Sequence, residues 1–322
     1  MNAVRIHQPG GPDVLRYEEV PTPLPAEGEA LVRLRAIGVN FIDIYHRSGQ
    51  YPMSFPAIIG QEGAGVVDSV GPGVHDVTPG DRVAFANVPG CYAEFATVPA
   101  WRCVKVPASL IFEQAAAAML QGMTAHYLSH TTYPIRRGDT ALVHAAAGGV
   151  GALLVQMAKH RAARVIGTVS SEEKARVARE AGADVVINYV TMDFVPEVKR
   201  LTAGQGVPVV YDSVGRDTFD RSLDCLALRG MLVLFGQASG RVPPVDPQIL
   251  NAKGSVFLTR PSLHHYTHTR EELLSHASDV LQWVGDGTIR LRIDQSFPLS
   301  RAAQAHEYLQ SRRALGKILL IP

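Results

Sequence analysis

The sequence predicts an α/β protein in which a doubly wound parallel sheet of six strands follows an irregular β domain. Between about Asp139 and Thr259, short apolar runs alternate with helical segments, and strands that are apolar on both faces are typical of a parallel sheet. From Met1 to about Leu110, short β-rich runs alternate with glycine and proline, which indicates strands joined by turns. A chain of 322 residues is long for one core and suits two domains.

The first part has β-rich runs at residues 29–35 and 65–70, with turn signals at residues 71–73 and 79–81. Strands of this kind can close into a small barrel, but the sequence alone does not establish closure. Residues 112–127 then change character, because a run rich in alanine is a strong helix former. We expect the domain boundary in this helix.

The second part begins with strands at 140–143 and 164–169. Later strands are expected at residues 184–187, 207–211, 231–235 and 255–258. The connecting helices are expected at residues 172–181, 193–202 and 217–226. Polar residues follow three of the strands, at 212–215, 235–239 and 259–261. In a doubly wound sheet the ligand lies at the carboxyl ends of the strands. After residue 261 the alternation stops, and helices at 270–285 and 300–313 precede a strand at 317–321. We expect this tail to return to the first domain.

The turn after the first of these strands resembles the dinucleotide fingerprint G-x-G-x-x-G, with Ala146, Gly148 and Gly151 at its three fixed positions. A small residue at Gly148 lets the backbone approach a pyrophosphate, and Gly151 lets the helix pack close to the strand. The phosphates then bind the free N–H groups at the positive end of the helix dipole. Tight packing of the helix on the sheet is the alternative explanation of the same glycines.

The end of the second strand indicates which dinucleotide is bound. NAD enzymes usually carry an acid there for the ribose 2′-hydroxyl, whereas NADP enzymes replace it by small and basic groups. Here the strand ends at Ser170 and Ser171, with Lys174 one helical turn further on. We interpret Ser170 and Glu173 as a capping box, which accounts for the nearby acid. The sequence therefore predicts NADPH as the cofactor.

Composition excludes some classes of function. Apolar residues make up 46% of the chain, charged residues 19%, and the formal net charge is +1, which gives no electrostatic case for nucleic acid or an anionic membrane as main partner. The N-terminus lacks the apolar core of a signal peptide, so we expect a cytoplasmic protein. Cys91, Cys103 and Cys225 form no C-x-x-C pair and are expected to be reduced, buried thiols.

Several motifs in register resemble one family over nearly the whole chain. Residues 36–43, 144–151, 211–217 and 259–263 are similar to the zinc-independent, zeta-crystallin-like quinone oxidoreductases of the medium-chain dehydrogenase/reductase superfamily. The resemblance implies a chaperonin-10 (GroES)-like barrel at residues 1–122 and 263–322. It also implies a Rossmann NADPH-binding domain at 123–262, and a homodimer assembled edge to edge through the nucleotide domains.

The resemblance also bears on metal chemistry. Zinc-containing members of the superfamily hold their catalytic metal with cysteine and histidine at places that correspond here to Asn40, Gln61 and Gln121. Neutral amides are poor zinc ligands compared with imidazole and thiolate, so metal-free catalysis is expected. His126 and His130 have a spacing that can bind zinc, but no carboxylate or thiolate partner is evident.

Without a Lewis acid, the substrate itself must accept hydride readily. A quinone does, because reduction makes an aromatic quinol, and a small-molecule quinone is the expected substrate. The alternative to hydride transfer is transfer of the electrons in single steps. We expect Asn40 and Tyr45 to donate hydrogen bonds to the developing oxyanion, with Gln61 behind them. The alternatives are an NADPH-dependent alkenal or enone reductase and, from another class, an RNA-binding or crystallin-like non-catalytic protein.

The remaining cofactor contacts are implied by the resemblance. The full set expected to surround NADPH is Asn40, Phe41, Ile42, Asp43, Tyr45, Thr124, Gly148, Gly149, Val150, Ser170, Lys174, Tyr189, Ser213, Val214, Phe235, Gly236, Gln237, Ser239, Arg260, Pro261, Ser262 and Arg312. Ser170, Lys174 and Tyr189 are expected around the 2′-phosphate, and Arg312 is expected to reach it from the tail.

Overall fold

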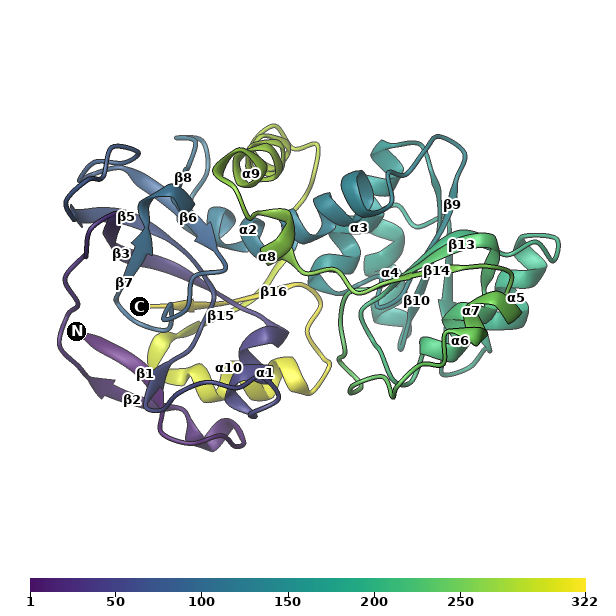
Figure 1. Ribbon diagram of the computed structural model, residues 1–322, viewed down its shortest axis with the longest axis horizontal. Coiled ribbons are helices and arrows are strands. Elements are labelled where there is room, and N and C mark those ends of the chain that lie inside the picture. The colour runs from purple at the N-terminus through teal and green to yellow at the C-terminus, as the bar shows by residue number, and fades with distance from the viewer. The chain divides into compact units, whose positions relative to one another are not determined.

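The computed structural model describes residues 1–322 and divides into two compact units (Figure 1). The first contains residues 1–123 and 266–322, and the second contains residues 124–265. The limits expected for the functional domains, 1–122 with 263–322 and 123–262, remain a prediction. No helix combines the length and apolarity that a bilayer crossing needs.

The first unit is built from two sheets. The larger has the order β15-β16-β3-β5-β6-β8, with β7 paired to β3 off this path, and the smaller has the order β2-β1-β4. The strands of the larger sheet are β3 (Glu29–Val39), β5 (Glu62–Val70), β6 (Arg82–Ala86), β7 (Phe95–Pro99), β8 (Val104–Lys105), β15 (Ile293–Pro298) and β16 (Lys317–Ile321), and those of the smaller are β1 (Asn2–Ile6), β2 (Arg16–Glu19) and β4 (Ala57–Ile58). One apolar cluster includes residues of both sheets, among them Ile6, Val32 and Phe85, so the two sheets enclose a common core.

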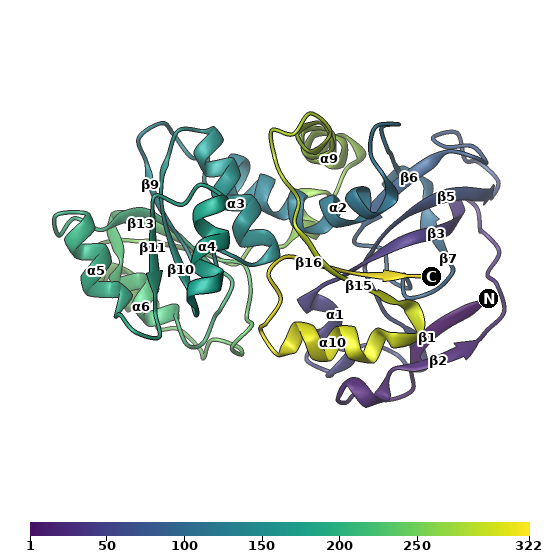
Figure 2. The ribbon, with the colours of Figure 1, turned by 180° about the vertical axis from the view of Figure 1, so that it is seen from behind.

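The C-terminal strand returns to this unit, as the sequence predicts. Strand β16 pairs antiparallel with β3, and Leu319 lies opposite Gly38. On the other side of β3, strand β5 pairs with Ile37 opposite Gly63. Figure 2 shows the yellow β15 and β16 beside the purple β3, so segments far apart in sequence are neighbours in one sheet.

The helices of the first unit are α1 (Phe41–Arg47), α9 (Arg270–Gly285) and α10 (Ala302–Gln310), while α2 (Phe112–Tyr127) and α8 (Leu263–Tyr266) run across the unit limits. Short 3₁₀ turns occur at Pro12–Val14, Ala100–Arg102 and Leu299–Arg301. The helix expected at residues 300–313 is therefore shorter, because a 3₁₀ turn precedes it and Arg312 adopts a left-handed conformation with φ 59°.

The second unit contains a six-stranded parallel sheet of order β11-β10-β9-β12-β13-β14. This order confirms the doubly wound fold. From β9 the chain adds β10 and β11 on one side, and it then crosses to add β12, β13 and β14 on the other side. The strands are β9 (Thr140–Val143), β10 (Arg164–Val169), β11 (Val185–Asn188), β12 (Val207–Asp212), β13 (Leu226–Leu234) and β14 (Phe257–Thr259).

Five helices connect these strands: α3 (Gly149–His160), α4 (Glu172–Glu180), α5 (Phe194–Leu201), α6 (Phe219–Asp224) and α7 (Gln248–Ala252). Helices α3 and α4 pack on β9, β10 and β11, and Figure 2 shows them on one side of these strands, with α5 and α6 on the other. Phe194 and Val198 of α5 share an apolar cluster with Phe219 and Leu223 of α6 and the sheet. Residues Leu128–Thr132 continue α2 as a π-helical turn.

Candidate active site and cofactor-binding residues

The glycine turn between β9 and α3 is as tight as its sequence predicts. Gly148 is the N-cap of α3, and Ala145, three residues earlier, has a positive φ of 51°. A Cβ atom on Gly151 would lie 2.2 Å from the carbonyl oxygen of Ala145, and one on Gly148 would lie 3.2 Å from the same atom. Only glycine at position 151 therefore allows the helix to approach the turn this closely.

Ala146, which stands in place of the first glycine of the fingerprint, is accommodated by the neighbouring strand. Its side chain is fully buried, and its N–H donates to the carbonyl oxygen of Thr168 at 3.1 Å. A Cβ atom on Gly167 would lie 2.7 Å from the Ala146 methyl group. The missing side chain at Gly167 thus provides the space that Ala146 fills.

The residues expected at the 2′-phosphate lie at the carboxyl ends of β10 and β11. Ser170 follows β10 and Tyr189 follows β11, and the last residues of the two strands, Val169 and Asn188, are paired. The Lys174 ammonium donates to the Ser170 hydroxyl at 3.3 Å. One basic and one hydroxyl side chain therefore meet at this edge of the sheet.

The capping box expected for Ser170 and Glu173 is wrong. Helix α4 starts at Glu172, and its N-cap is Ser171, whose hydroxyl accepts the N–H of Lys174 at 3.2 Å. The helix begins at Glu172, as expected, but its cap is Ser171 rather than Ser170, because two consecutive serines are equally suited to cap it. The Ser170 hydroxyl is consequently available to Lys174.

Asp212, at the end of β12, organises the next strand ends. Sequence reasoning placed it at a polar strand end but did not assign it this role. Its fully buried carboxylate accepts the N–H groups of Val214 and Gly215 at 2.8 and 3.0 Å, and the hydroxyls of Thr218 and Ser222. The carboxylate thus fixes the turn that carries Ser213 and Val214. An acid at the end of an apolar strand was the available signal.

His144 lies in the core of this unit. Thr168 and Ser222 lie 2.8 and 3.0 Å from its two ring nitrogens, and burial lowers its pKa. The Ser222 hydroxyl donates to Asp212, so Nε2 of His144 must donate to Ser222 and Nδ1 must accept from Thr168. His144, which follows β9, thus links Thr168 of β10 to Ser222 of α6 through its side chain.

Two pockets occur in the second unit. One, of about 230 Å³, is lined by three residues expected at the cofactor, Gly236, Gln237 and Arg260, together with apolar side chains that include Leu234 and Leu258. Ser239 lies nearby in the chain and donates to the carbonyl oxygen of Val214 at 2.8 Å. The strand ends β12 and β13 are therefore tied together where the cofactor residues gather.

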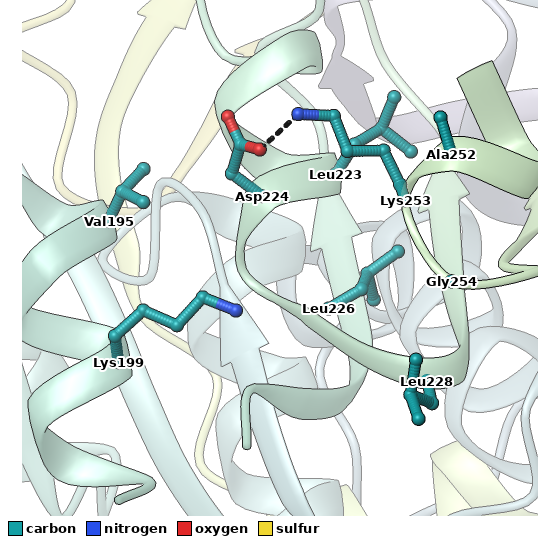
Figure 3. Close-up of a pocket in the computed structure, with 9 residues that line it drawn as sticks. All are labelled: Val195, Lys199, Leu223, Asp224, Leu226, Leu228, Ala252, Lys253 and Gly254. Atoms are coloured by element: carbon teal, nitrogen blue, oxygen red, sulfur yellow. Dashed lines mark hydrogen bonds and ion pairs between the residues drawn. The ribbon is translucent and has the colours of Figure 1, made fainter. Parts of the chain in front are cut away.

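The other pocket, of about 410 Å³, contains none of the residues expected from the sequence (Figure 3). Lys253 and Asp224 form an ion pair at its rim, while Lys199 extends from α5 on the opposite side.

The remaining expected residues are divided between the two units. The second unit contains Thr124, Gly149, Val150, Phe235, Pro261 and Ser262. The first unit contains Asn40, Phe41, Ile42, Asp43, Tyr45, Gln61 and Arg312.

In the first unit, Asn40 is the centre of a buried polar group. It is the N-cap of α1, directly after β3, and its side chain is 4% exposed. Its amide oxygen accepts from the Lys317 ammonium at 2.8 Å, and its amide nitrogen donates to Glu62 at 2.9 Å. Lys317 is also ion-paired with Glu62. Sequence reasoning missed both charged residues, since they lie far from Asn40 in the chain.

The amide expected behind Asn40, Gln61, is not the residue that contacts it. Successive side chains of an extended segment point to opposite sides, and the contact is made by the neighbouring Glu62. Gln121 approaches from α2, with its amide nitrogen 3.5 Å from the Asn40 oxygen. Two of the three amides that stand at the places of zinc ligands are therefore brought together. No group of three or more His, Cys, Asp or Glu side chains is arranged to hold a metal ion.

Tyr45 lies on α1, one turn after Asn40, and its side chain is buried. Its ring meets Tyr51 edge-on, with 5.6 Å between ring centroids, and Phe41 lies 6.5 Å away. Tyr51 was not among the expected residues. Helix α1 and the segment that follows it thus form an aromatic cluster of Phe41, Tyr45 and Tyr51.

Asp43 closes the first turn of α1 and is completely buried. Its Oδ2 atom accepts the Asn40 N–H at 2.8 Å and the Tyr92 hydroxyl at 3.1 Å, whereas Oδ1 has no hydrogen-bond partner. Burial raises the pKa of this carboxyl to about 7. Asp43 was expected at the cofactor, and in the structure its side chain holds the helix start.

A chain of hydrogen bonds extends from Asp43 to helix α10. Arg47 lies 3.0 Å from Nδ1 of His306, and Tyr92 lies 2.8 Å from Nε2. Arginine is always a donor, so Nδ1 of His306 accepts from Arg47 and Nε2 carries the proton. Nε2 then donates to the Tyr92 hydroxyl, and that hydroxyl donates to Asp43. Burial lowers the pKa of His306 to about 3, which keeps this tautomer neutral.

Comparison with known proteins covers both units. The alcohol dehydrogenase GroES-like domain matches residues 26–108, and the zinc-binding dehydrogenase domain matches residues 149–276. A quinone oxidoreductase of Pseudomonas aeruginosa is 48% identical over 97% of this chain and 97% of its own. The chain belongs to the quinone oxidoreductase family of the medium-chain dehydrogenases/reductases.

Solved structures of quinone oxidoreductases are similar to this chain as well. The Escherichia coli quinone oxidoreductase complexed with NADPH superimposes with a TM-score of 0.98, at 47% identity over 100% of both chains. A 2-haloacrylate reductase of a Burkholderia species is 45% identical over 99% of this chain and 98% of its own. Both units of the present structure thus have counterparts in a quinone oxidoreductase.

Proposed function

We propose that this protein is an NADPH-dependent quinone oxidoreductase. The observation that carries the proposal is the identity of 47–48% to quinone oxidoreductases, sustained over 97–99% of the chain. A relative of the same fold carries NADPH in its solved structure. The substrate class is a small quinone, which gains two electrons and two protons, the equivalent of a hydride and a proton, and becomes an aromatic quinol.

The residues of the second unit fit NADPH. Gly148 and Gly151 leave no side chain between the turn and the start of α3, so backbone N–H groups at the positive end of this 12-residue helix are suited to a pyrophosphate. The pair of Lys174 and Ser170 supplies a cation and a hydroxyl for a 2′-phosphate. NADPH, when bound, supplies the hydride. The protein's part is to bind, orient and exclude water.

Further contacts to NADPH are proposed at residues that the sequence indicates. Gly149 and Val150 follow the N-cap of α3, and Thr124 begins the second unit. Tyr189, Ser213, Val214, Phe235, Gly236, Gln237, Ser239, Arg260, Pro261 and Ser262 complete the set in this unit. In the first unit the proposed contacts are Asn40, Phe41, Ile42, Asp43, Tyr45 and Arg312.

For the chemistry in the first unit we propose Asn40, Tyr45 and Gln61 as catalytic residues. Tyr45 is the proposed hydrogen-bond donor to the oxygen on which negative charge develops. Support comes from its position one turn after Asn40, beside Phe41 and Tyr51. Aromatic side chains that meet edge-on and tilted can pack against the planar ring of a quinone.

A second candidate activity is reduction of an activated carbon–carbon double bond. The 2-haloacrylate reductase that is 45% identical favours it. A conjugated alkene also accepts hydride at one carbon and a proton at the next, so an alkenal, enone or acrylate makes similar demands on the site.

We further propose a homodimer assembled through the edge of the six-stranded sheet, in the cytoplasm. Strand β14 is an edge strand whose Phe257 is 57% exposed, and Leu228 of the neighbouring β13 is 77% exposed. Exposed apolar side chains on an unpaired edge favour pairing with another chain. The three cysteines are free and buried, which fits a reducing compartment.

The test is an NADPH-oxidation assay with a panel of benzoquinones, naphthoquinones, enones and haloacrylates, run with a metal chelator present. Turnover of quinones with NADPH supports the proposal, and turnover of the alkenes alone supports the second candidate. Calorimetry without substrate measures NADPH binding separately. Absence of any NADPH-binding heat contradicts both activities.

A further inference from the structure

We propose that Lys317 and Glu62 are positioning residues of the active site, which act by holding the side-chain amide of Asn40 in a single orientation. The proposal rests on the proposed oxidoreductase function. Its tests include one measurement that needs neither NADPH nor substrate.

The sheet register brings these residues together. Ile318 of β16 pairs antiparallel with Val39, so the preceding residue, Lys317, lies opposite Asn40. Ile37 of β3 pairs with Gly63 of β5, so Glu62 lies opposite Gly38. The lysine and the glutamate therefore approach the end of β3 from its two sides, one from the C-terminal tail and one from the barrel.

Their chemistry determines how the amide is turned. An ammonium group only donates hydrogen bonds, and an ionised carboxylate only accepts them. Lys317 lies 2.8 Å from one end of the Asn40 amide and Glu62 lies 2.9 Å from the other. The end at Lys317 must be the oxygen, and the end at Glu62 must be the nitrogen. In a flipped amide, the NH₂ group would face the Lys317 ammonium, and the amide oxygen would face the Glu62 carboxylate. Neither pair can form a hydrogen bond.

Glu62 is itself held on both carboxylate oxygens. Oε1 accepts the backbone N–H of Leu120 in α2, and Oε2 accepts from Lys317 and Asn40. Lys317 and Glu62 are 2% and 0% exposed. The orientation of Asn40 is thus tied to β5, β16 and α2 at once.

The backbone provides a built space for this group. A Cβ atom on Gly38 would lie 1.9 Å from a Glu62 carboxylate oxygen and 2.8 Å from Cε of Lys317. The glycine two residues before Asn40 therefore gives room to the ion pair. Stability alone is a poor explanation for such a pair, because apolar side chains of similar volume often stabilise a core as well or better.

The fixed amide orients the start of α1 and the side chains around it. The second N–H of Asn40 is directed to the Gly38 carbonyl at 3.3 Å, and its oxygen also lies 3.5 Å from the amide nitrogen of Gln121. Asn40 thus connects the ion pair to Gln121 and, as the N-cap of α1, to the turn that carries Phe41 and Tyr45. Loss of its orientation misplaces these neighbours relative to the substrate.

The first experiment follows the side-chain amide of Asn40 by NMR in the full-length protein without ligands, with the signal assigned through its loss in Asn40→Ser. In Lys317→Met we expect hydrogen exchange of this amide to accelerate by roughly tenfold or more. Lys105→Met is the matched control, because Lys105 forms an exposed ion pair with Asp81; it should leave the signal unchanged. An unchanged Asn40 signal in Lys317→Met overturns the proposal, whether or not the protein turns over quinones.

The second experiment separates positioning from folding. Lys317→Met should lower kcat with the quinone roughly 10- to 100-fold, since small misplacements near the reacting atoms have effects of this size. The affinity for NADPH, measured by calorimetry, should change less than about twofold. The double variant Lys317→Met/Glu62→Gln leaves no lone buried charge, so it should recover thermal stability without recovering kcat. Recovery of both together would show that the pair serves stability alone and would overturn the proposal.

Discussion

The hydroxyl of Tyr92 donates a hydrogen bond to Oδ2 of Asp43 across 3.1 Å, and so connects the segment between β6 and β7 to the first turn of α1. The same hydroxyl accepts from His306 of α10 at 2.8 Å. Three parts of the chain that are far apart in sequence therefore hold the start of the helix that carries Tyr45.

Tyr92→Phe should lower the free energy of unfolding by about 1–3 kcal/mol. The substitution leaves the His306 Nε2–H without its acceptor and removes one donor from Asp43, and unsatisfied buried polar groups cost about this much. Urea denaturation followed by circular dichroism measures the change. Tyr17→Phe, at an exposed position, is the control and should differ from the wild type by less than about 0.5 kcal/mol.

The pH dependence of stability should contain two opposing contributions. Asp43 has its pKa raised from 3.8 to about 7, so its stabilising contribution is complete below pH 3.8 and is lost as the pH rises to about 7. His306 has its pKa lowered from 6.5 to about 3. The unfolded chain binds that proton more tightly, so stability is gained as the pH rises from about 3 to 6.5.

Asp43→Asn isolates the histidine contribution. Relative to the wild type, the variant should gain about 4 kcal/mol between pH 4 and pH 7, the free energy that corresponds to the raised pKa of Asp43. Denaturant titrations at a series of pH values measure the difference. A difference that stays constant with pH would mean that Asp43 ionises normally in the folded protein.

Gly151→Ala should destabilise the second unit by about 1–3 kcal/mol, the usual cost of overpacking, because the new methyl group meets the Ala145 carbonyl oxygen at 2.2 Å. Gly148→Ala is the comparison, since its methyl group has 3.2 Å to the same atom. Thermal unfolding should rank Gly148→Ala above Gly151→Ala in stability. Equal melting temperatures would contradict the close packing of α3 on its turn.

Lys174→Met should lower kcat/KM for NADPH by roughly 10-fold and leave kcat/KM for NADH nearly unchanged, because only NADPH presents a phosphate to the ammonium. Steady-state kinetics with each nucleotide provides the measurement. Arg176→Met, on the same helix, is the control, since Arg176 forms an exposed ion pair with Glu180. Parallel losses with both nucleotides would remove Lys174 from the 2′-phosphate site.

Tyr45→Phe should lower kcat with quinones several-fold, by about 3- to 10-fold for the loss of one hydrogen bond that strengthens in the transition state. The affinity for NADPH is expected to stay the same. Rapid mixing of the NADPH-loaded protein with quinone measures the chemical step directly. An unchanged rate constant would assign the proton or hydrogen bond to solvent.

Local patterns were sufficient for the second unit. Alternating apolar runs and helices identify the six strands, and the order of the sheet follows the general rule for doubly wound folds. The glycines at 148 and 151 are recognisable because backbone conformation and close packing restrict residue type at single positions. The N-cap of α4 was predicted at Ser170 but is Ser171. Neighbouring residues with equal capping propensity do not show which of them caps the helix.

The sequence by itself determined the fold class, the nucleotide turn and the return of the C-terminal strand, because each depends on short-range periodicity or on a residue type that only one backbone geometry accepts. Only the tertiary structure decided that Glu62 rather than Gln61 meets Asn40, and that Lys317 and His306 from the tail complete these buried groups. Those contacts join residues up to 277 positions apart. They depend on strand register and on which face each side chain takes, and a shift of one residue reverses the face.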